Sequence, residues 1–223
     1  VSFRLAGSDF EGHIERHLPG VEVTTGNLGQ GLSSAIGLGL ADRLSSVKNH
    51  IWVVTGDGEN QKGQICEARR FAAKYGLDNL TCIVDLNELQ ISGETEQVMP
   101  VDIEAEFSAS GWEVTRTDGH DLASLYQALN PKWQRKPRLV LADTVMGKGV
   151  SFMEGRADFH GRALKPDELK AALDELGAQD DMEQLRRERK TYLEIHGNRF
   201  SEEPHFHLAS KVGTPVTYDP DHR

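Results

Sequence analysis

One acidic residue and one amide residue are spaced along the chain as ligands of a divalent cation would be. Asp57 stands between two glycines directly after the apolar run Ile51 to Thr55, and Asn87 follows the next such run, Leu80 to Asp85. In an open α/β sheet, ligands bind beyond the carboxyl ends of the strands, so both side chains should enter one crevice. A carboxylate and an amide oxygen are hard ligands of the kind that Mg²⁺ takes and shares with phosphate. A plain strand-ending turn also uses Gly, Asp and Gly, but Asn87 at this distance favours a ligand site.

Short β-branched runs that alternate with helical patterns must position these two side chains. Between the two runs, apolar residues recur at helical spacing from Gln64 to Tyr75, and Gly76 suits the end of a helix. The alternation continues along the chain, which predicts an α/β fold with an open, mostly parallel sheet and helices on both faces. We expect further helices over Leu32 to Leu44, Ile103 to Ser110, Leu122 to Leu129 and Lys165 to Leu176, a charged, solvated helix face over Glu183 to Lys190, and further strands over Trp112 to Thr117 and Arg138 to Asp143.

The bulk composition bounds the domain organisation and the partners. The chain has 223 residues, 38% of them hydrophobic, which predicts one domain over residues 1–196 and a linker or C-terminal arm over residues 197–223. The formal net charge of -10 argues against nucleic acid as a partner, because binding to phosphate backbones needs clustered Lys and Arg. A small diphosphate is still allowed, since backbone N–H groups and a cation can hold it.

Other features predict a cytoplasmic protein with no membrane partner. No apolar run approaches the length of a membrane span, and residues 1–12 lack the basic-then-apolar pattern of a signal peptide. The two cysteines, Cys66 and Cys82, fall in a predicted helix and a predicted strand without metal-type spacing. We therefore expect reduced thiols in the core.

Several longer stretches accompany the Asp57 and Asn87 pair. They are Gly12-His13, Pro19 to Gly31, Val98-Met99-Pro100, Thr117 to Asp121 and Phe159 to Lys165. In this order, together with Gly-Asp-Gly and Asn87, they resemble the transketolase family of thiamine-diphosphate-dependent enzymes. The resemblance covers Val1 to Gly177 and is to the diphosphate-binding half of these enzymes.

The resemblance implies a cofactor, a metal and site residues. It implies thiamine diphosphate held through Mg²⁺ or Ca²⁺, with the side chains of Asp57 and Asn87 and the carbonyl of Leu89 as metal ligands. It implies that Gly58 lies against the diphosphate and that Gly26, Leu28 and Gly29 line the thiazolium, with Gly56 and Glu59 completing the cofactor-binding set. It also implies catalytic roles for three residues: His13 would face the reacting carbons of a ketose, His160 would approach the diphosphate or the substrate, and Glu67 would belong to an acidic network at the interface between subunits.

The activity implied by the resemblance is the transfer of a two-carbon ketol unit between sugar phosphates. The cofactor of this family sits between two domains, so the resemblance also implies a partner, either a pyrimidine-binding domain or a separate pyrimidine-binding subunit, in a homo- or hetero-oligomer. The chain departs from the family pattern in three ways. The family's upstream segment and pyrimidine-binding domain are missing, and Lys62 stands where a glutamate is common. Pro215 to Pro220 resembles the lead-in to the missing domain.

Two other functions compete with this interpretation. Gly29-Gln30-Gly31 follows Val21-Glu22-Val23 and precedes a helical pattern, as in a dinucleotide-binding turn of a nucleotide-dependent oxidoreductase. Ser34 replaces the third glycine of that turn, and no acid ends a second strand at the usual distance. The other competitor is a non-catalytic or regulatory module that keeps the fold, which Lys62 and the missing segments favour.

Overall fold

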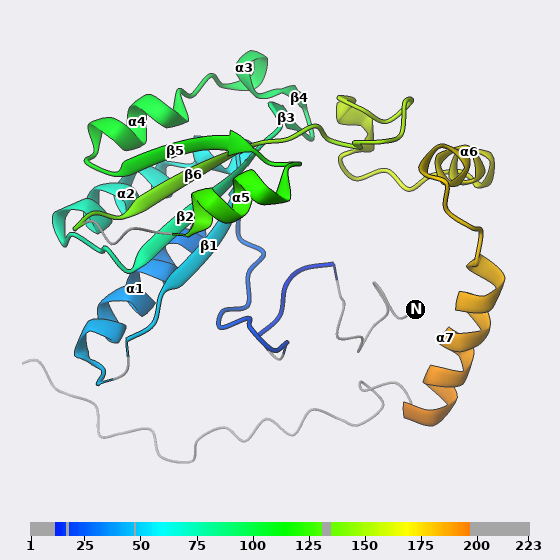
Figure 1. The fold of residues 1–223 in the computed structure, drawn as a ribbon, viewed down its shortest axis with the longest axis horizontal. Coiled ribbons are helices and arrows are strands. Elements are labelled where there is room, and N and C mark those ends of the chain that lie inside the picture. The colour runs from blue at the N-terminus through cyan, green and yellow to red at the C-terminus, as the bar shows by residue number, and fades with distance from the viewer. Residues whose placement is uncertain (1–11, 17, 47, 131–134, 197–223) are drawn as a thin grey trace, which may run out of the picture. The chain divides into compact units, whose positions relative to one another are not determined.

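The four main strands form one parallel sheet in the computed structural model of the chain, which describes residues 12–16, 18–46, 48–130 and 135–196. The strands are β1 (Ile51–Gly56), β2 (Leu80–Leu86), β5 (Glu113–Asp118) and β6 (Arg138–Asp143), in the spatial order β1-β2-β6-β5. Figure 1 shows them running side by side. Gly56 pairs with Asp85, and Asp143 pairs with both Leu86 and Asp118, so the carboxyl ends of all four strands are level.

Helices cover both faces of this sheet. Helices α1 (Gln30–Leu44), α2 (Gly63–Lys74) and α4 (Ile103–Ala109) bury their apolar residues in one core with alternate residues of β2 and β6. Helix α5 (Leu122–Leu129) contacts β5 and β6 and lies on the opposite face (Figure 1). The core on the first face includes Leu32, Ile65, Phe107, Cys82 and Leu139. The predicted fold class, an open parallel sheet with helices on both faces, is confirmed.

Short elements connect the strand ends to the second half of the chain. A 3-10 turn, η1 (Gly58–Gln61), follows β1. After β2 come the hairpin of β3 (Leu89–Gln90) and β4 (Gly93–Glu94) and the single turn α3 (Thr95–Val98). The 3-10 turn η2 (Ala157–Phe159) and helix α6 (Pro166–Leu176) follow β6. The hairpin was not predicted, because strands of two residues give no alternating pattern.

Helix α7 (Met182–His196) belongs, apart from its first residue, to a second compact unit of the chain. Its charged residues pair along its own surface, as between Arg186 and Glu183. This confirms the solvated helix face expected over residues 183–190. No helix among the described residues is both long and apolar enough to cross a bilayer. The predicted arm over residues 197–223, with Pro215 to Pro220, lies outside the described residues.

Both cysteines are free thiols. Cys82 is fully buried on β2, as predicted, whereas Cys66 on α2 is only partly buried. The expectation of a core thiol therefore holds for Cys82 and needs correction for Cys66, which lies at the edge of the core.

Candidate cofactor and metal site

Asp57 lies at the carboxyl end of β1 and is almost fully buried, with 5% of its surface exposed. One carboxylate oxygen accepts the Gly58 N–H at 2.6 Å, and the other accepts the N–H groups of Asn87, at 3.1 Å, and Glu88. Burial raises the pKa of the Asp57 carboxyl, because desolvation of the charge outweighs these three hydrogen bonds, and the nearby charge of Asp85 raises it further. The site therefore holds a carboxylate whose charge is incompletely compensated by the protein.

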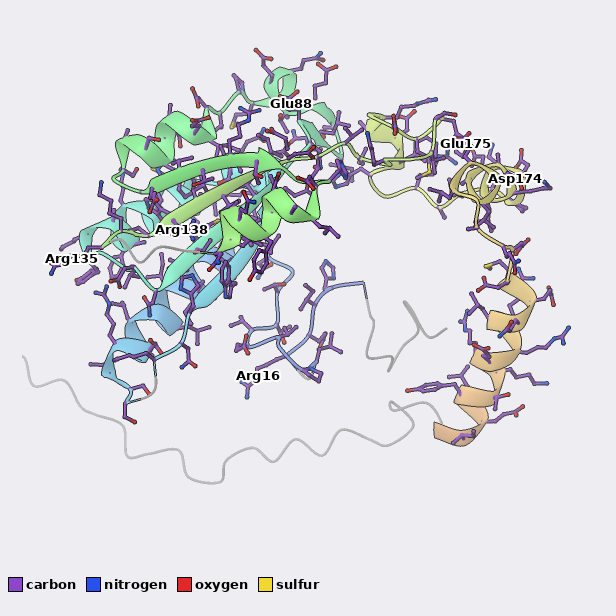
Figure 2. The ribbon with its side chains drawn as sticks, in the orientation of Figure 1. Arg16, Glu88, Arg135, Arg138, Asp174 and Glu175 are labelled. Atoms are coloured by element: carbon purple, nitrogen blue, oxygen red, sulfur yellow. The ribbon has the colours of Figure 1, made fainter. Side chains whose placement is uncertain are left out.

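Asn87 lies just beyond the end of β2, against Asp57. Its side-chain oxygen accepts the Leu89 N–H at 3.0 Å, and its NH₂ group donates to a carboxylate oxygen of Asp85 at 3.4 Å. Glu88 has a φ of 62°, a left-handed conformation that is uncommon for residues other than glycine. This turn aims two successive N–H groups at one oxygen of Asp57. Figure 2 labels Glu88 at this edge of the sheet, beside the β3 and β4 hairpin.

Asp57 and Asn87 each keep an oxygen position that no protein donor uses. A carboxylate offers about four lone-pair positions and an amide oxygen two. Asp57 uses three with protein donors and Asn87 uses one. One position therefore remains on each, and carboxylate, amide and carbonyl oxygens are the donors that Mg²⁺ and Ca²⁺ prefer. In the described part of the chain, no group of three or more His, Cys, Asp or Glu side chains could hold a metal. The predicted ligand set is of a different kind, because Asp57 is its only such side chain and the other ligands are the Asn87 amide and the Leu89 carbonyl.

A cavity of about 360 Å³ opens beside Asp57, between the strand ends and the segment around α3. Five carboxylates are among its lining residues: Asp57, Glu88, Glu94, Glu96 and Asp102. Leu86, Met99, Pro100, Val101 and Ile103 form its apolar part. This negative lining repels a free diphosphate and attracts cations, so a diphosphate next to Asp57 requires a cation between the two.

Gly58, the second glycine of the motif, is closely covered by the side chain of Gln90. A Cβ atom added to Gly58 would lie 2.7 Å from Oε1 and 3.1 Å from Cβ of Gln90. Gly56 shows no such restriction, because nothing lies within 4 Å of the equivalent position. The sequence did not single out Gln90. Its contact with Gly58 arises from the β3 and β4 hairpin, which the sequence pattern did not reveal.

Glu59 joins two of the predicted glycine turns. Its carboxylate accepts the Gly29 N–H at 2.8 Å and the Gly56 N–H at 3.2 Å. Gly29 has a φ of 90° and immediately precedes helix α1. The turn before α1 and the turn after β1, about thirty residues apart in the chain, are thus held next to each other.

His13 lies against the same turn. A Cβ atom added to Gly26 would be 3.6 Å from Cδ2 of the His13 ring, so this ring covers Gly26. Backbone hydrogen bonds hold the two segments together, with the Thr25 N–H donating to the Ile14 carbonyl at 3.1 Å. Two residues that the sequence predicted for one site are therefore adjacent. Leu28, at the tip of the turn, is 57% exposed and available for a ligand or partner.

His160 and Glu67 are not brought to this cluster by any hydrogen bond among the described residues. His160 follows η2, which packs near β4, and its N–H donates to the Ala157 carbonyl at 2.9 Å. Glu67 lies on the exposed side of α2, opposite the buried Ile65 and Ala68. The catalytic roles of these two residues stay predictions.

The segment after His160 is fixed through Glu168 on α6. The carboxylate of Glu168 accepts hydrogen bonds from both terminal nitrogens of Arg162, at 2.8 and 3.0 Å, and from the Lys165 N–H at 2.8 Å. The Arg162 guanidinium also lies over the Phe159 ring, 4.2 Å from its centroid. The Phe159 to Lys165 motif therefore has a structural reason: its side chains shape the loop that carries His160.

The structure removes the main support for a dinucleotide-binding turn. That fold needs a strand directly before the glycine-rich turn. Val21-Glu22-Val23 forms no strand, and the segment instead runs alongside residues 14–16 through hydrogen bonds such as Arg16 N–H to Thr24 Oγ1 at 3.1 Å. The first strand of the sheet is β1, and it ends at the Asp57 turn.

Residues 1–202 match the family described as "Transketolase, thiamine diphosphate binding domain". The chain is 41% identical over 178 residues to one of the subunits of apulose-4-phosphate transketolase from Actinobacillus succinogenes, covering 78% of this chain and 64% of that protein. It is 40% identical over 164 residues to the 6-deoxy-6-sulfo-D-fructose transketolase subunit SqwG of a Clostridium species, covering 72% of this chain and 60% of that protein. The chain thus spans less than two thirds of the length of these relatives.

Solved structures show the same similarity. The crystal structure of transketolase from Campylobacter jejuni superposes with a TM-score of 0.74 at 33% identity, covering 80% of this chain and 29% of that one. Transketolase from Leishmania mexicana gives a TM-score of 0.70 at 29% identity, covering 87% of this chain and 33% of that one. The likeness extends over most of the described residues of this chain and under half of each neighbour.

Proposed function

The chain belongs to the transketolase family through its thiamine diphosphate binding domain, and from this premise we propose that it is the diphosphate- and metal-binding half of an enzyme that transfers a two-carbon ketol unit between sugar phosphates. The observation that carries the proposal is the contact of Asp57 with the Asn87 backbone at the ends of neighbouring strands. Relatives named as transketolase subunits support the division of such an enzyme between chains.

In this proposal, Asp57, Asn87 and the Leu89 carbonyl hold Mg²⁺ or Ca²⁺, which neutralises the diphosphate beside an acidic wall. The turn from Gly26 to Gly29 receives the ring of the cofactor, and Gly56, Gly58 and Glu59 shape the turn near its diphosphate. When bound, thiamine diphosphate supplies the chemistry that breaks and forms the carbon–carbon bond of a ketose.

The remaining residues position the substrate and move protons. His13 lies against Gly26, and in this proposal it would face the substrate and donate or accept a proton at the sugar hydroxyls. His160 approaches from the loop after η2. Glu67 lies on an exposed helix face, which suits contact with a pyrimidine-binding domain or subunit, in a homo- or hetero-oligomer. We place the enzyme in the cytoplasm, with residues 1–196 as the binding domain and 197–223 as an arm.

Thermal unfolding tests the binding claim. A ligand that binds only the folded state raises the melting temperature by an amount that grows with its concentration relative to Kd. We expect stabilisation by thiamine diphosphate with Mg²⁺, little by either alone, and none by NAD. Stabilisation by NAD alone would overturn the proposal.

Turnover tests the enzymatic claim. Ketose phosphate consumption is measured with the chain alone and with candidate pyrimidine-binding subunits added. We expect activity only in the mixture. Cofactor binding without turnover in any mixture would instead support a non-catalytic module.

A further inference from the structure

Each oxygen of the Glu59 carboxylate accepts a backbone N–H group, and the two N–H groups belong to separate turns. Oε1 accepts the N–H of Gly29 at 2.8 Å, and Oε2 accepts the N–H of Gly56 at 3.2 Å. Each oxygen serves a different turn, so the side chain spans the gap between them. The resemblance to the family gave Glu59 only a general place among the cofactor-binding residues, whereas this geometry defines what its side chain does.

The turn at Gly29 is confined on a second side by Lys62. A Cβ atom at Gly29 would lie 2.9 Å from Cβ and 3.1 Å from Cγ of Lys62, so the stem of Lys62 packs directly against the glycine. Gly29 also offers no side-chain cap to helix α1. Two residues therefore contact this turn: Glu59, which lies in η1, and Lys62, which directly follows η1.

The hydrogen bonds of Glu59 also limit what the two glycines can do. Because their N–H groups already donate to Glu59, neither can donate to a ligand without releasing that carboxylate. Gly29 and Gly56 therefore contribute close backbone approach and not N–H donors. The distance between the two glycines, which Glu59 holds, would then affect the affinity for a bound cofactor.

We propose that Glu59 is a positioning residue, which holds the turn before α1 at a fixed separation from the turn after β1 so that one thiamine diphosphate can touch both. This inference rests on the proposed function. Outer partners that orient a ligand-binding group commonly change affinity by about 10- to 100-fold when removed.

The test compares Glu59→Ala and Glu59→Gln with the wild-type protein by calorimetric titration of thiamine diphosphate at saturating Mg²⁺. Alanine removes both hydrogen bonds, and we expect Kd to rise by about 10-fold or more. Glutamine keeps one accepting oxygen but turns an NH₂ group toward the other N–H, so an intermediate Kd is expected. The requirement for Mg²⁺ should persist in both variants, because Glu59 is not among the proposed metal ligands.

Glu175→Gln is the matched control. The carboxylate of Glu175 likewise accepts two hydrogen bonds across the fold, from the N–H and the hydroxyl of Ser151, but it lies on α6. We expect its Kd for thiamine diphosphate to equal that of the wild type. Equal weakening in Glu175→Gln and Glu59→Ala would assign the effect to general loss of stability and overturn the inference.

Hydrogen exchange gives a readout that does not need the cofactor. In the cofactor-free protein, Glu59→Ala should speed exchange of the Gly29 and Gly56 amides while amides of the α2 core keep their wild-type rates. If wild type binds thiamine diphosphate and Glu59→Ala binds equally well, the inference fails and the proposed function stands. If wild type shows no binding with Mg²⁺, the proposed function fails and takes the inference with it.

Discussion

The carboxylates of Asp57 and Glu168 each accept three hydrogen bonds, yet their pKa values move in opposite directions. At Asp57, burial raises the pKa despite three N–H donors. At Glu168, which keeps part of its surface in solvent, the hydrogen bonds from Arg162 and Lys165 lower the pKa to about 2. The difference has two causes. Glu168 is bonded to a guanidinium cation, whereas Asp57 has only neutral N–H donors beside a like charge, and burial costs Asp57 more of its hydration.

The Asp57 region and the loop from Phe159 to Lys165 are held in place by different interactions. The Asp57 region has a backbone scaffold that holds a buried negative charge needing a cation. The loop from Phe159 to Lys165, which carries His160, is instead held by a partly exposed ion pair and by stacking on Phe159. We expect changes in the first region to alter ligand affinity strongly and changes in the second to alter it weakly.

The largest effect is expected for Asp57→Ala. Because the substitution removes the one carboxylate among the proposed metal ligands, Mg²⁺-dependent binding of thiamine diphosphate should weaken by more than about 100-fold, beyond the range for outer partners. Titration calorimetry measures this change. The control is Asp118→Ala, at the same edge of the sheet but on β5, where Asp118 accepts the His120 N–H. Equal losses in both variants would contradict the assignment of the metal to Asp57.

A smaller effect is expected for Gly58→Ala, because its Cβ would meet the Gln90 side chain at 2.7 Å. Because Oε1 is the end of a flexible side chain that can move aside, the cost should lie at the lower end for overpacking, about 1 kcal/mol in the free energy of unfolding in urea. Gly63→Ala is the control, since nothing lies within 4 Å of its Cβ position. Adding Gln90→Ala to Gly58→Ala should restore stability. A double variant as unstable as the single one would show that Gln90 is not the obstacle.

A still smaller effect is expected for Glu168→Gln. A carboxylate with a lowered pKa stabilises the folded state above its unfolded value, 4.5, and this contribution disappears as pH falls toward 2. The variant should therefore be slightly less stable than wild type at pH 7, and the difference should vanish near pH 2. Urea unfolding across this pH range measures it. A difference that does not depend on pH would argue against the ion pair with Arg162.

The smallest effect is expected for Cys82, a buried thiol that, unlike Asp57, accepts no backbone N–H group in the described structure. Burial raises the pKa of its thiol to about 12. We expect iodoacetamide at pH 8 to modify the partly buried Cys66 and leave Cys82 unmodified in the folded protein, with no change in stability at low occupancy. Mass spectrometry of tryptic peptides locates the label. Equal labelling of both thiols would show that β2 opens readily.

The regular elements could be predicted from the sequence because their patterns are local. The strand over Arg138 to Asp143 and the helix over Leu122 to Leu129 have the predicted bounds, and the other elements of the sheet and its covering helices differ by one or two residues. Helix α7 extends six residues beyond the predicted end at Lys190. The adjacency of Asp57 and Asn87 also followed from a general rule, since parallel strands level their carboxyl ends. The spacing of the motif thus carried three-dimensional information.

Contacts made by isolated side chains could not be predicted in the same way. The Glu59 bridge between Gly29 and Gly56 depends on where α1 begins relative to β1, and Gln90 reaches Gly58 through a hairpin of two-residue strands. Glu67 is the opposite case. Helical spacing already placed it opposite Ile65 and Ala68, so its exposure could have been inferred.

The most direct test is a crystal structure of the protein with Ca²⁺ and thiamine diphosphate. Our account predicts a single ion at about 2.3–2.6 Å from oxygens of Asp57, Asn87 and the Leu89 carbonyl, with the diphosphate completing its coordination. An ion bound elsewhere, or a diphosphate bound without contact to an ion at Asp57, would contradict it.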